Sequence, residues 1–249
     1  MKTLILGGTG EARELAHIAS GERGFEIVSS LAGRVRDPLL PEGPVRIGGF
    51  GGVDGLRKWL VANEIAVIID ATHPFASTIS TNAASAATDL GLPLLHVRRP
   101  GWREQSGDRW HRVPDLDAAA QAVSGLGERV FLTIGRQGVA AFAGLTDRWF
   151  LIRAIDPPAG ALPPQHELLL ARGPFSPADE LRLLIQYRID LLVTKDSGGD
   201  QTGAKLAAAR SAGIPVVVVD RPELPAAAIV AETVSEAWKW LRDIASGRS

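Results

Sequence analysis

A glycine-rich turn near the start of the chain has the residue types and spacing of a phosphate-binding site. Residues 7–10, Gly-Gly-Thr-Gly, separate the apolar run of residues 3–6 from a segment with helical periodicity. Glycines let the backbone turn sharply and approach a ligand closely, and a helix that follows presents unpaired N–H groups to an anion. We therefore expect Gly8, Thr9 and Gly10 to bind a nucleotide pyrophosphate. The match to the dinucleotide fingerprint is partial, because an arginine occupies the third glycine position, and an ordinary strand-to-helix turn is the alternative interpretation.

The end of the next apolar run indicates which coenzyme this turn would serve. Residues 25–28 lead into Ser29, Ser30 and, a few residues later, Arg34. A coenzyme without a ribose phosphate usually meets an acidic residue at this point, whereas a phosphate needs hydroxyls or arginine there. The sequence therefore favours NADP(H) over NAD(H), with Ser30 and Arg34 as the phosphate contacts. A solvated loop charge is the alternative for Arg34.

Polar side chains also follow most of the other apolar runs. Ligands of doubly wound sheets bind at the carboxyl ends of the strands, so these positions are the candidates for a site. The candidates outside the first two runs are Thr72, His73, Arg136, Arg153, Arg172, Lys195, Asp196 and Ser197.

The composition excludes several kinds of site and partner. Lys and Arg number 27 against 28 Asp and Glu, so the net charge of −1 creates no field that would recruit nucleic acid or an anionic membrane. The chain has no cysteine, and its five histidines lack metal-ligand spacing, so we expect no metal site. No basic-then-apolar leader begins the sequence, and no apolar stretch reaches the roughly 18 residues that cross a bilayer. A cytoplasmic protein is the expectation.

Three familiar catalytic motifs are missing. The sequence contains neither the GxSxG nucleophile elbow nor the GxxxxGK[ST] phosphate loop. The YxxxK pair is also absent, since the only tyrosine, Tyr187, is followed four residues later by Leu191. Acyl transfer, ATP hydrolysis and carbonyl reduction of the short-chain type are therefore disfavoured.

Apolar runs and helical patterns alternate along the whole chain, which predicts an α/β fold with mainly parallel sheets. We divide it into two Rossmann-like lobes, residues 1–100 binding NADP(H) and residues 101–249 contributing to the substrate site, with the active site in the cleft between them. The boundary lies in the irregular, arginine-rich stretch of residues 98–112. Strands are predicted at residues 3–6, 25–28, 45–47, 65–69, 93–97, 130–134, 149–154, 167–171, 191–194 and 216–219. Helices of the second lobe are predicted at residues 114–123, 136–142, 177–188, 201–212 and 235–244.

Several motifs together resemble a known family. They are GGTGEARELA at residues 7–16, DATHPFA at 70–76, RPGW at 99–102, TIGR at 133–136, RGPF at 172–175 and VTKDSGGDQTGAKLAA at 193–208. These motifs span nearly the whole chain and are similar to those of the precorrin-6A reductase family. The resemblance implies an NADPH-dependent reduction of one double bond in a corrin precursor, which turns precorrin-6A into precorrin-6B on the route to cobalamin. A tetrapyrrole is then the substrate, and protein side chains need hold no metal.

The resemblance also implies roles for the candidate residues. Thr72 and His73 would border the nicotinamide. The many carboxylates of the substrate would need basic and polar contacts, for which the candidates are Arg99, Arg136, Arg153, Arg172, Lys195 and Ser197. The proton donor stays open among His73, Lys195, Asp196 and Asp147, with solvent or a substrate carboxylate as further possibilities. Structural roles, such as hydrogen bonding within a turn, are the alternative for His73 and for residues 195–197.

Two other functions fit the same nucleotide-binding lobe. One is a reductase or epimerase that acts on a different small molecule. The other is a redox-sensing module that binds NADP(H) and passes a domain movement to a protein partner without catalysis. No helix carries a clear apolar dimer stripe, so both a monomer and a homodimer are compatible with the sequence.

Overall fold

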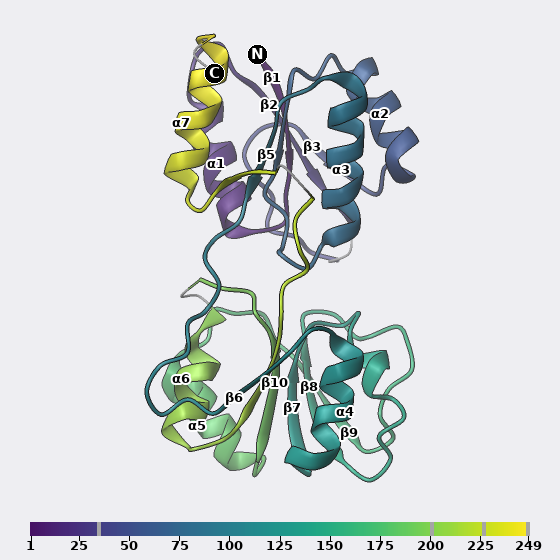
Figure 1. Ribbon diagram of the computed structural model, residues 1–249, viewed down its shortest axis with the longest axis vertical. Helices are drawn as coiled ribbons and strands as arrows, with labels where there is room; N and C mark the ends of the chain where they lie inside the picture. Colours follow the sequence, from purple (N-terminus) through teal and green to yellow (C-terminus); the bar gives the residue numbers. More distant parts are fainter. Residues whose placement is uncertain (34–35, 200–201, 226–227, 248–249) are drawn as a thin grey trace. The chain divides into compact units, whose positions relative to one another are not determined.

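The chain folds into two compact units, each built on one parallel sheet. The computed structural model describes residues 1–33, 36–199, 202–225 and 228–247. One unit combines Met1–Pro100 with Pro222–Ser249, and the other is Gly101–Arg221. Each unit contains a six-stranded sheet with helices on both faces (Figure 1), as the alternating sequence pattern predicts.

The sheet of the first unit has the strand order β12-β5-β4-β1-β2-β3. Counted from the other edge, the strands β3-β2-β1-β4-β5 follow the order of a doubly wound nucleotide-binding fold. The strands are β1 (Lys2–Leu6), β2 (Glu26–Leu31), β3 (Val45–Ile47), β4 (Val67–Asp70), β5 (Leu94–Val97) and β12 (Ile229–Ala231). The helices are α1 (Gly10–Ser20), α2 (Gly52–Ala62), α3 (Ser77–Leu90) and α7 (Val234–Ala245). Helices α1 and α7 cover one face, and α2 and α3 cover the other (Figure 1).

Continuous apolar runs make the central strands of this sheet. Leu4, Ile5, Ile68 and Ile69 are completely buried, because both faces of the sheet are covered by helices. The turn of residues 7–9 leads from β1 into helix α1, where the hydroxyl oxygen of Thr9 accepts a hydrogen bond from the Ala12 N–H at 3.1 Å. This cap fixes the position at which the helix N-terminus faces the end of β1.

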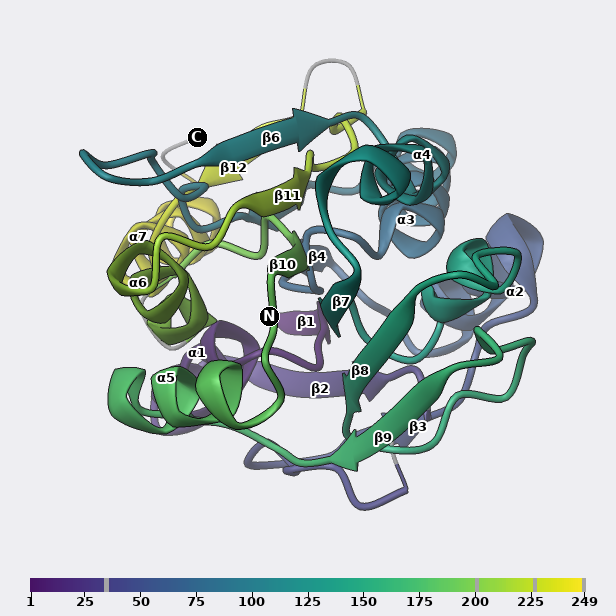
Figure 2. The same cartoon turned by 90° about the horizontal axis from the view of Figure 1, so that it is seen from below.

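The second unit repeats the architecture with the order β6-β11-β10-β7-β8-β9. Helices α5 and α6 lie on one side of its sheet and α4 on the other (Figure 2). The strands are β6 (Trp110–Val113), β7 (Arg129–Thr133), β8 (Trp149–Ala154), β9 (His166–Leu170), β10 (Leu191–Lys195) and β11 (Val216–Val219). The helices are α4 (Leu116–Leu126), the 3-10 helix η1 (Val139–Phe142), α5 (Pro177–Gln186) and α6 (Ala204–Ser211).

The predicted second lobe, residues 101–249, is too long at its C-terminal end. The structure assigns Pro222–Ser249 to the first unit. Strand β12 pairs in parallel with β5, Ile229 opposite Leu95, and Ala237 and Leu241 of α7 are fully buried in the core that α1 also forms. The strand that follows β5 in the sequence, β6, instead pairs with β11 of the second sheet. The strand that follows β5 in the sequence therefore joins the second sheet, and the strand that follows β11 joins the first.

Two further sequence predictions differ from the structure. Strands β6 and β12 were not expected, because β6 lies in the arginine-rich stretch and β12 is only three residues long. The helix predicted at residues 136–142 is reduced to the single 3-10 turn Val139–Phe142.

The buried face of α7 gives a test of its place in the first unit. We expect Leu241→Ala to destabilise that unit by about 2–5 kcal/mol, because the substitution leaves a cavity at a fully buried position. Native-state hydrogen exchange should show lost protection of the β1 amides while the β10 amides keep theirs. Lys239→Ala, at an exposed position of the same helix, is the control. Loss of protection in β10 instead would contradict the assignment.

Candidate active site

The glycine turn after β1 is shaped for a ligand that approaches the backbone. Gly8 has a φ of +117°, which side chains other than glycine rarely adopt, and a Cβ built there would meet no atom within 4 Å. The space above the turn is therefore open to a ligand, and the N-terminus of α1 provides N–H donors beside it. These features fit the pyrophosphate of a dinucleotide.

Thr9 has a structural role within this turn. Its hydroxyl donates a hydrogen bond to the Ala71 carbonyl at 2.7 Å and accepts one from the Ala12 N–H. The Thr9 side chain thereby joins the ends of β1 and β4 and is itself buried. A ligand would meet the backbone of this residue rather than its hydroxyl group.

The end of β2 lies directly beside the glycine turn. The Gly7 N–H donates to the Ser30 carbonyl at 2.9 Å, and the buried Ser30 side chain faces Arg46 of β3, whose Nη1 lies 3.4 Å from the Ser30 hydroxyl oxygen. Arg34, the second predicted phosphate contact, lies outside the residues that the structure describes. Ser30 thus has the predicted place, and Arg46 is a cation that the sequence analysis did not select.

Asp70 of β4 and His96 of the neighbouring strand β5 form a buried pair. The Asp70 carboxylate at the end of β4 lies 3.0 Å from Nδ1 of His96 on β5, and the two side chains are only 3% and 2% exposed. The second Asp70 oxygen accepts hydrogen bonds from the Thr72 N–H at 3.1 Å and the Thr72 hydroxyl at 2.6 Å. Asp70 therefore fixes the turn that carries Thr72.

The charge state of Asp70 follows from these contacts. Burial by itself raises the pKa of this carboxyl, but the hydrogen bonds from His96, Ser80 and Thr72 outweigh it and lower the pKa. Asp70 is therefore an ionised acceptor at neutral pH. It orients its neighbours and is not a proton donor.

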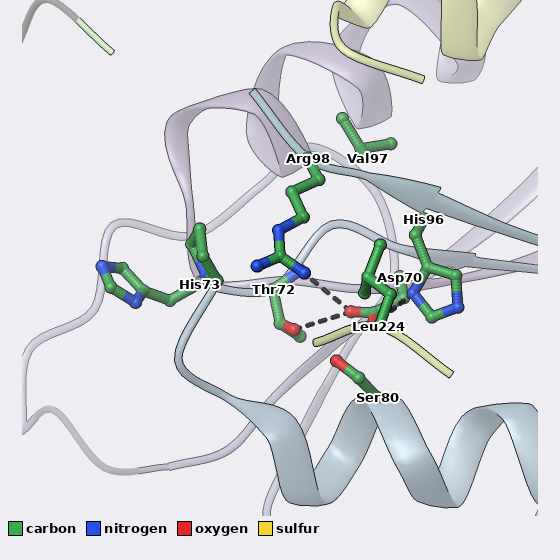
Figure 3. Close-up of a pocket in the computed structure, with 9 residues that line it drawn as sticks. Asp70, Thr72, His73, Ser80, His96, Val97, Arg98 and Leu224 are labelled. Atoms are coloured by element: carbon green, nitrogen blue, oxygen red, sulfur yellow. Dashed lines mark hydrogen bonds and ion pairs between the residues drawn. The ribbon is translucent and has the colours of Figure 1, made fainter. Parts of the chain in front are cut away.

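A small pocket opens above this pair. Asp70, Thr72, His96 and Arg98 are among its lining residues, and the Arg98 side chain points toward Asp70 (Figure 3). His73 borders the same pocket, but its ring points away from Asp70 and His96. His73 is exposed, and its Nδ1 accepts a hydrogen bond from the Phe75 N–H at 3.3 Å. Thr72 and His73 thus lie beside one pocket, as the position of their motif at a strand end predicts.

Asp196 in the second unit is enclosed by hydrogen-bond donors. Its carboxylate accepts hydrogen bonds from the Trp102 N–H at 3.0 Å and from Arg112 at 2.9 Å, and its carbonyl accepts one from Arg221 at 2.7 Å. The side chain is 4% exposed. Trp102 and Arg221 stand at the two ends of this unit's chain segment, so Asp196 holds both ends against β10.

The other predicted residues of the second unit divide by the sheet edge at which they lie. Arg136, Arg172, Lys195 and Ser197 follow or end strands at the carboxyl edge, and burial lowers the pKa of Lys195. Asp147 precedes β8 and therefore lies at the opposite edge, where it is exposed and ion-paired with Arg148 at 2.9 Å. The structure does not bring Asp147 together with the other candidates.

Two predicted substrate contacts are engaged in ion pairs within their own units. Arg99 lies 2.8 Å from Glu11 of α1. Arg153 lies 2.6 Å from the buried Glu180, and its guanidinium carbon is 3.8 Å from the centre of the Phe175 ring. A substrate carboxylate would compete with these acidic partners for both arginines.

A buried lysine next to Arg153 was not found from the sequence. Lys205 on α6 is 6% exposed, donates to the Thr202 carbonyl at 2.6 Å and lies 4.7 Å from the centre of the Trp102 ring. Burial lowers the pKa of Lys205 to about 7, and nearby Arg153 contributes to the shift while Glu180 opposes it. Lys205 lies within the last of the motifs that carry the family resemblance, but its position among alanines does not indicate that it is buried. His96 was missed for a related reason, since it lies inside an apolar strand.

The residues that the structure describes contain no group of three or more acidic or histidine side chains arranged to hold a metal ion. Within the same part of the chain, every helix is too short or too polar to span a membrane.

Comparison with known proteins identifies the family. A family model described as precorrin-6x reductase CbiJ/CobK matches residues 2–242. The chain belongs to this family. It is 58% identical over 240 residues to a precorrin-6A reductase of Rhodococcus erythropolis, with 96% of this chain and 97% of that protein covered. A precorrin-6A reductase of Mycobacterium tuberculosis is 51% identical over 246 residues, with 98% and 99% covered.

A solved structure supports the same family and fold. It is described as CobK precorrin-6A reductase, is 43% identical, and matches with a TM-score of 0.91 over 98% of this chain and 96% of that one. The resemblance seen in the sequence motifs and the predicted pair of Rossmann-like lobes are both confirmed.

The buried Lys205 predicts how the stability of the protein depends on pH. The pKa of Lys205 is about 7 in the folded protein and near its usual 10.5 when the chain is unfolded. The unfolded state therefore binds more protons between these values, so stability should rise as the pH increases from about 7 toward 10.5. We expect Lys205→Met to remove this part of the rise, measured by urea unfolding across the pH range.

The exposed Lys58 provides the control for this measurement. Lys58→Met should leave the pH dependence of the wild-type protein intact. An equal change in both variants would show that the Lys205 ammonium titrates as it does in solvent.

Proposed function

We propose that this protein reduces one double bond of the precorrin-6A macrocycle, giving precorrin-6B in cobalamin biosynthesis, with NADPH as the hydride donor. The observation that carries the proposal is the match, at 58% identity over nearly the full length of both chains, to a protein named precorrin-6A reductase. The open glycine turn after β1 supports the choice of a dinucleotide. When bound, the nicotinamide supplies the hydride, and the protein supplies the binding and orientation.

The first unit would bind the coenzyme. Gly8, Thr9 and Gly10, with the N-terminal amides of α1, receive the pyrophosphate. Ser30 and Arg34 contact the ribose phosphate. Thr72, whose hydroxyl and N–H are fixed by Asp70, borders the nicotinamide together with His73.

The second unit would supply most of the contacts to the polyacidic substrate. Arg136, Arg172, Lys195 and Ser197 lie at the carboxyl edge of its sheet, where polar side chains can meet carboxylates. Arg99 of the first unit has the same role in this proposal. Arg153 is ion-paired with Glu180, so in this proposal it binds a substrate carboxylate in competition with that acidic partner.

The reduction also needs a proton at the carbon next to the one that receives the hydride. Asp196 is a poor donor, because its carboxylate already accepts hydrogen bonds from Trp102 and Arg112. Asp147 lies at the opposite sheet edge. We therefore assign the proton transfer to Lys195 or His73, and the lowered pKa of Lys195 favours proton release from its ammonium group.

One assay tests the function directly. The protein is incubated with precorrin-6A and NADPH, and the coenzyme absorbance is followed together with the macrocycle spectrum. We expect both to change in a fixed ratio. Coenzyme binding without turnover would favour the redox-sensing alternative, and NADPH oxidation with only a non-tetrapyrrole substrate would favour another reductase.

The role of the glycine turn can be tested with a matched pair of variants. Gly8→Ala should raise KM for NADPH about tenfold or more, a loss of about 1.4 kcal/mol, because the new methyl group occupies the ligand space. Gly24→Ala is the control, since Gly24 also has a positive φ, +92°, and an open surrounding but lies after α1 and away from the turn. Equal effects on KM would show that backbone strain alone is responsible.

A further inference from the structure

Among the residues that the structure describes, Arg46 on β3 has only neutral partners. Its Nη1 donates to the Gly48 carbonyl and lies 3.4 Å from the Ser30 hydroxyl oxygen, and its Nη2 donates to the Gly49 carbonyl at 2.6 Å. Its guanidinium carbon is 3.8 Å from the centre of the Phe50 ring. In the part of the chain that the structure describes, no carboxylate lies within ion-pair distance of Arg46.

The charge of Arg46 is therefore not compensated locally. Its half-buried position lowers the pKa of the guanidinium, which is the direction expected where a cation loses water without gaining an anion. Arg57 on the nearby helix α2 shows the contrast, since it lies 3.1 Å from Asp54 and 3.2 Å from Asp89. An added anion would improve the electrostatic surroundings of Arg46 and not those of Arg57.

The guanidinium is also held in place before any ligand arrives. The carbonyls of Gly48 and Gly49 and the face of Phe50 fix its orientation, so little side-chain entropy would be lost on binding. A guanidinium has five N–H donors, and these acceptors with the Ser30 hydroxyl use three of them. Donors for a further acceptor group remain.

The position of Arg46 connects it to the glycine turn. Arg46 is the register partner of Ser30, and the Ser30 carbonyl accepts the hydrogen bond from the Gly7 N–H. The carboxyl end of β2 is where a fold of this order receives the ribose of a dinucleotide. An anion next to the Ser30 hydroxyl would therefore be attached to that ribose.

We propose that Arg46 is a specificity-determining residue that binds the ribose 2′-phosphate of the coenzyme together with the Ser30 hydroxyl. The proposal rests on the proposed function, because it assumes that the first unit binds a phosphorylated nicotinamide dinucleotide. It adds to Ser30 a cation whose orientation is fixed by the fold.

The direct test uses two nucleotides that differ in the 2′-phosphate. Adenosine 2′,5′-bisphosphate and 5′-AMP are titrated into the protein by calorimetry. We expect the wild type to prefer the bisphosphate and Arg46→Gln to lose about ten- to a hundredfold of that preference, because charge-assisted hydrogen bonds to phosphate are removed. Arg46→Lys, which keeps the charge but not the planar fork, should lose less.

The matched control is Arg57→Gln, since Arg57 is an arginine of the same unit that already has acidic partners. It should leave the preference for the bisphosphate unchanged. If Arg46→Gln binds both nucleotides as the wild type does, or weakens both equally, the proposal for Arg46 is overturned.

Kinetics separate this proposal from the proposed function. With precorrin-6A as substrate, Arg46→Gln should lower kcat/KM with NADPH ten- to a hundredfold and leave the value with NADH within about twofold. A wild-type protein that discriminates the two nucleotides through Arg46 but does not reduce precorrin-6A would refute the function and support the phosphate site. A wild-type reductase whose preference for NADPH survives in Arg46→Gln would support the function and refute the site.

Discussion

A buried carboxylate closes the same strand in each sheet. Asp70 ends β4 and Asp196 directly follows β10, and both strands are third in the order of their sheet, counted from β12 and from β6. Burying a charge is costly unless it is paired and hydrogen-bonded, and each carboxylate meets that requirement in its own way. Asp70 takes its donors from His96 and Thr72, and Asp196 takes them from Trp102 and Arg112. The two carboxylates therefore fix the polar loops that follow β4 and β10.

The exchange of edge strands explains why the division of the chain was only partly predictable. The boundary near residue 100 follows from the loss of pattern in the arginine-rich stretch. The return of β12 and α7 to the first unit does not follow from the sequence pattern. A three-residue strand has no periodicity, and the apolar face of α7 could pack on the sheet of either unit. The pairing of β12 with β5 and the burial of Leu241 assign both elements to the first unit.

The candidate site was predictable where function and strand pattern coincide. Gly8, Ser30 and Thr72 follow apolar runs, so the rule for carboxyl strand ends located them. His96 and Lys205 escaped, because their partners come from other elements: His96 meets Asp70 across the β4–β5 register, and Lys205 meets Trp102 of the incoming chain. Pairings of this kind depend on sheet order and helix packing, which residue spacing along a single chain does not encode.

The distribution of arginines shows how a nearly neutral protein can still bind anions. The chain has 27 basic and 28 acidic residues, and several of its arginines have an acidic partner within the fold, as Arg153 does in Glu180 and Arg112 does in Asp196. Such pairs stabilise or orient the chain, and their charge is already compensated. Arg46 differs because carbonyls and aromatic rings hold it in place without neutralising it. A fixed, uncompensated cation beside a hydroxyl at a strand end has the charge and the donors that a phosphate group needs.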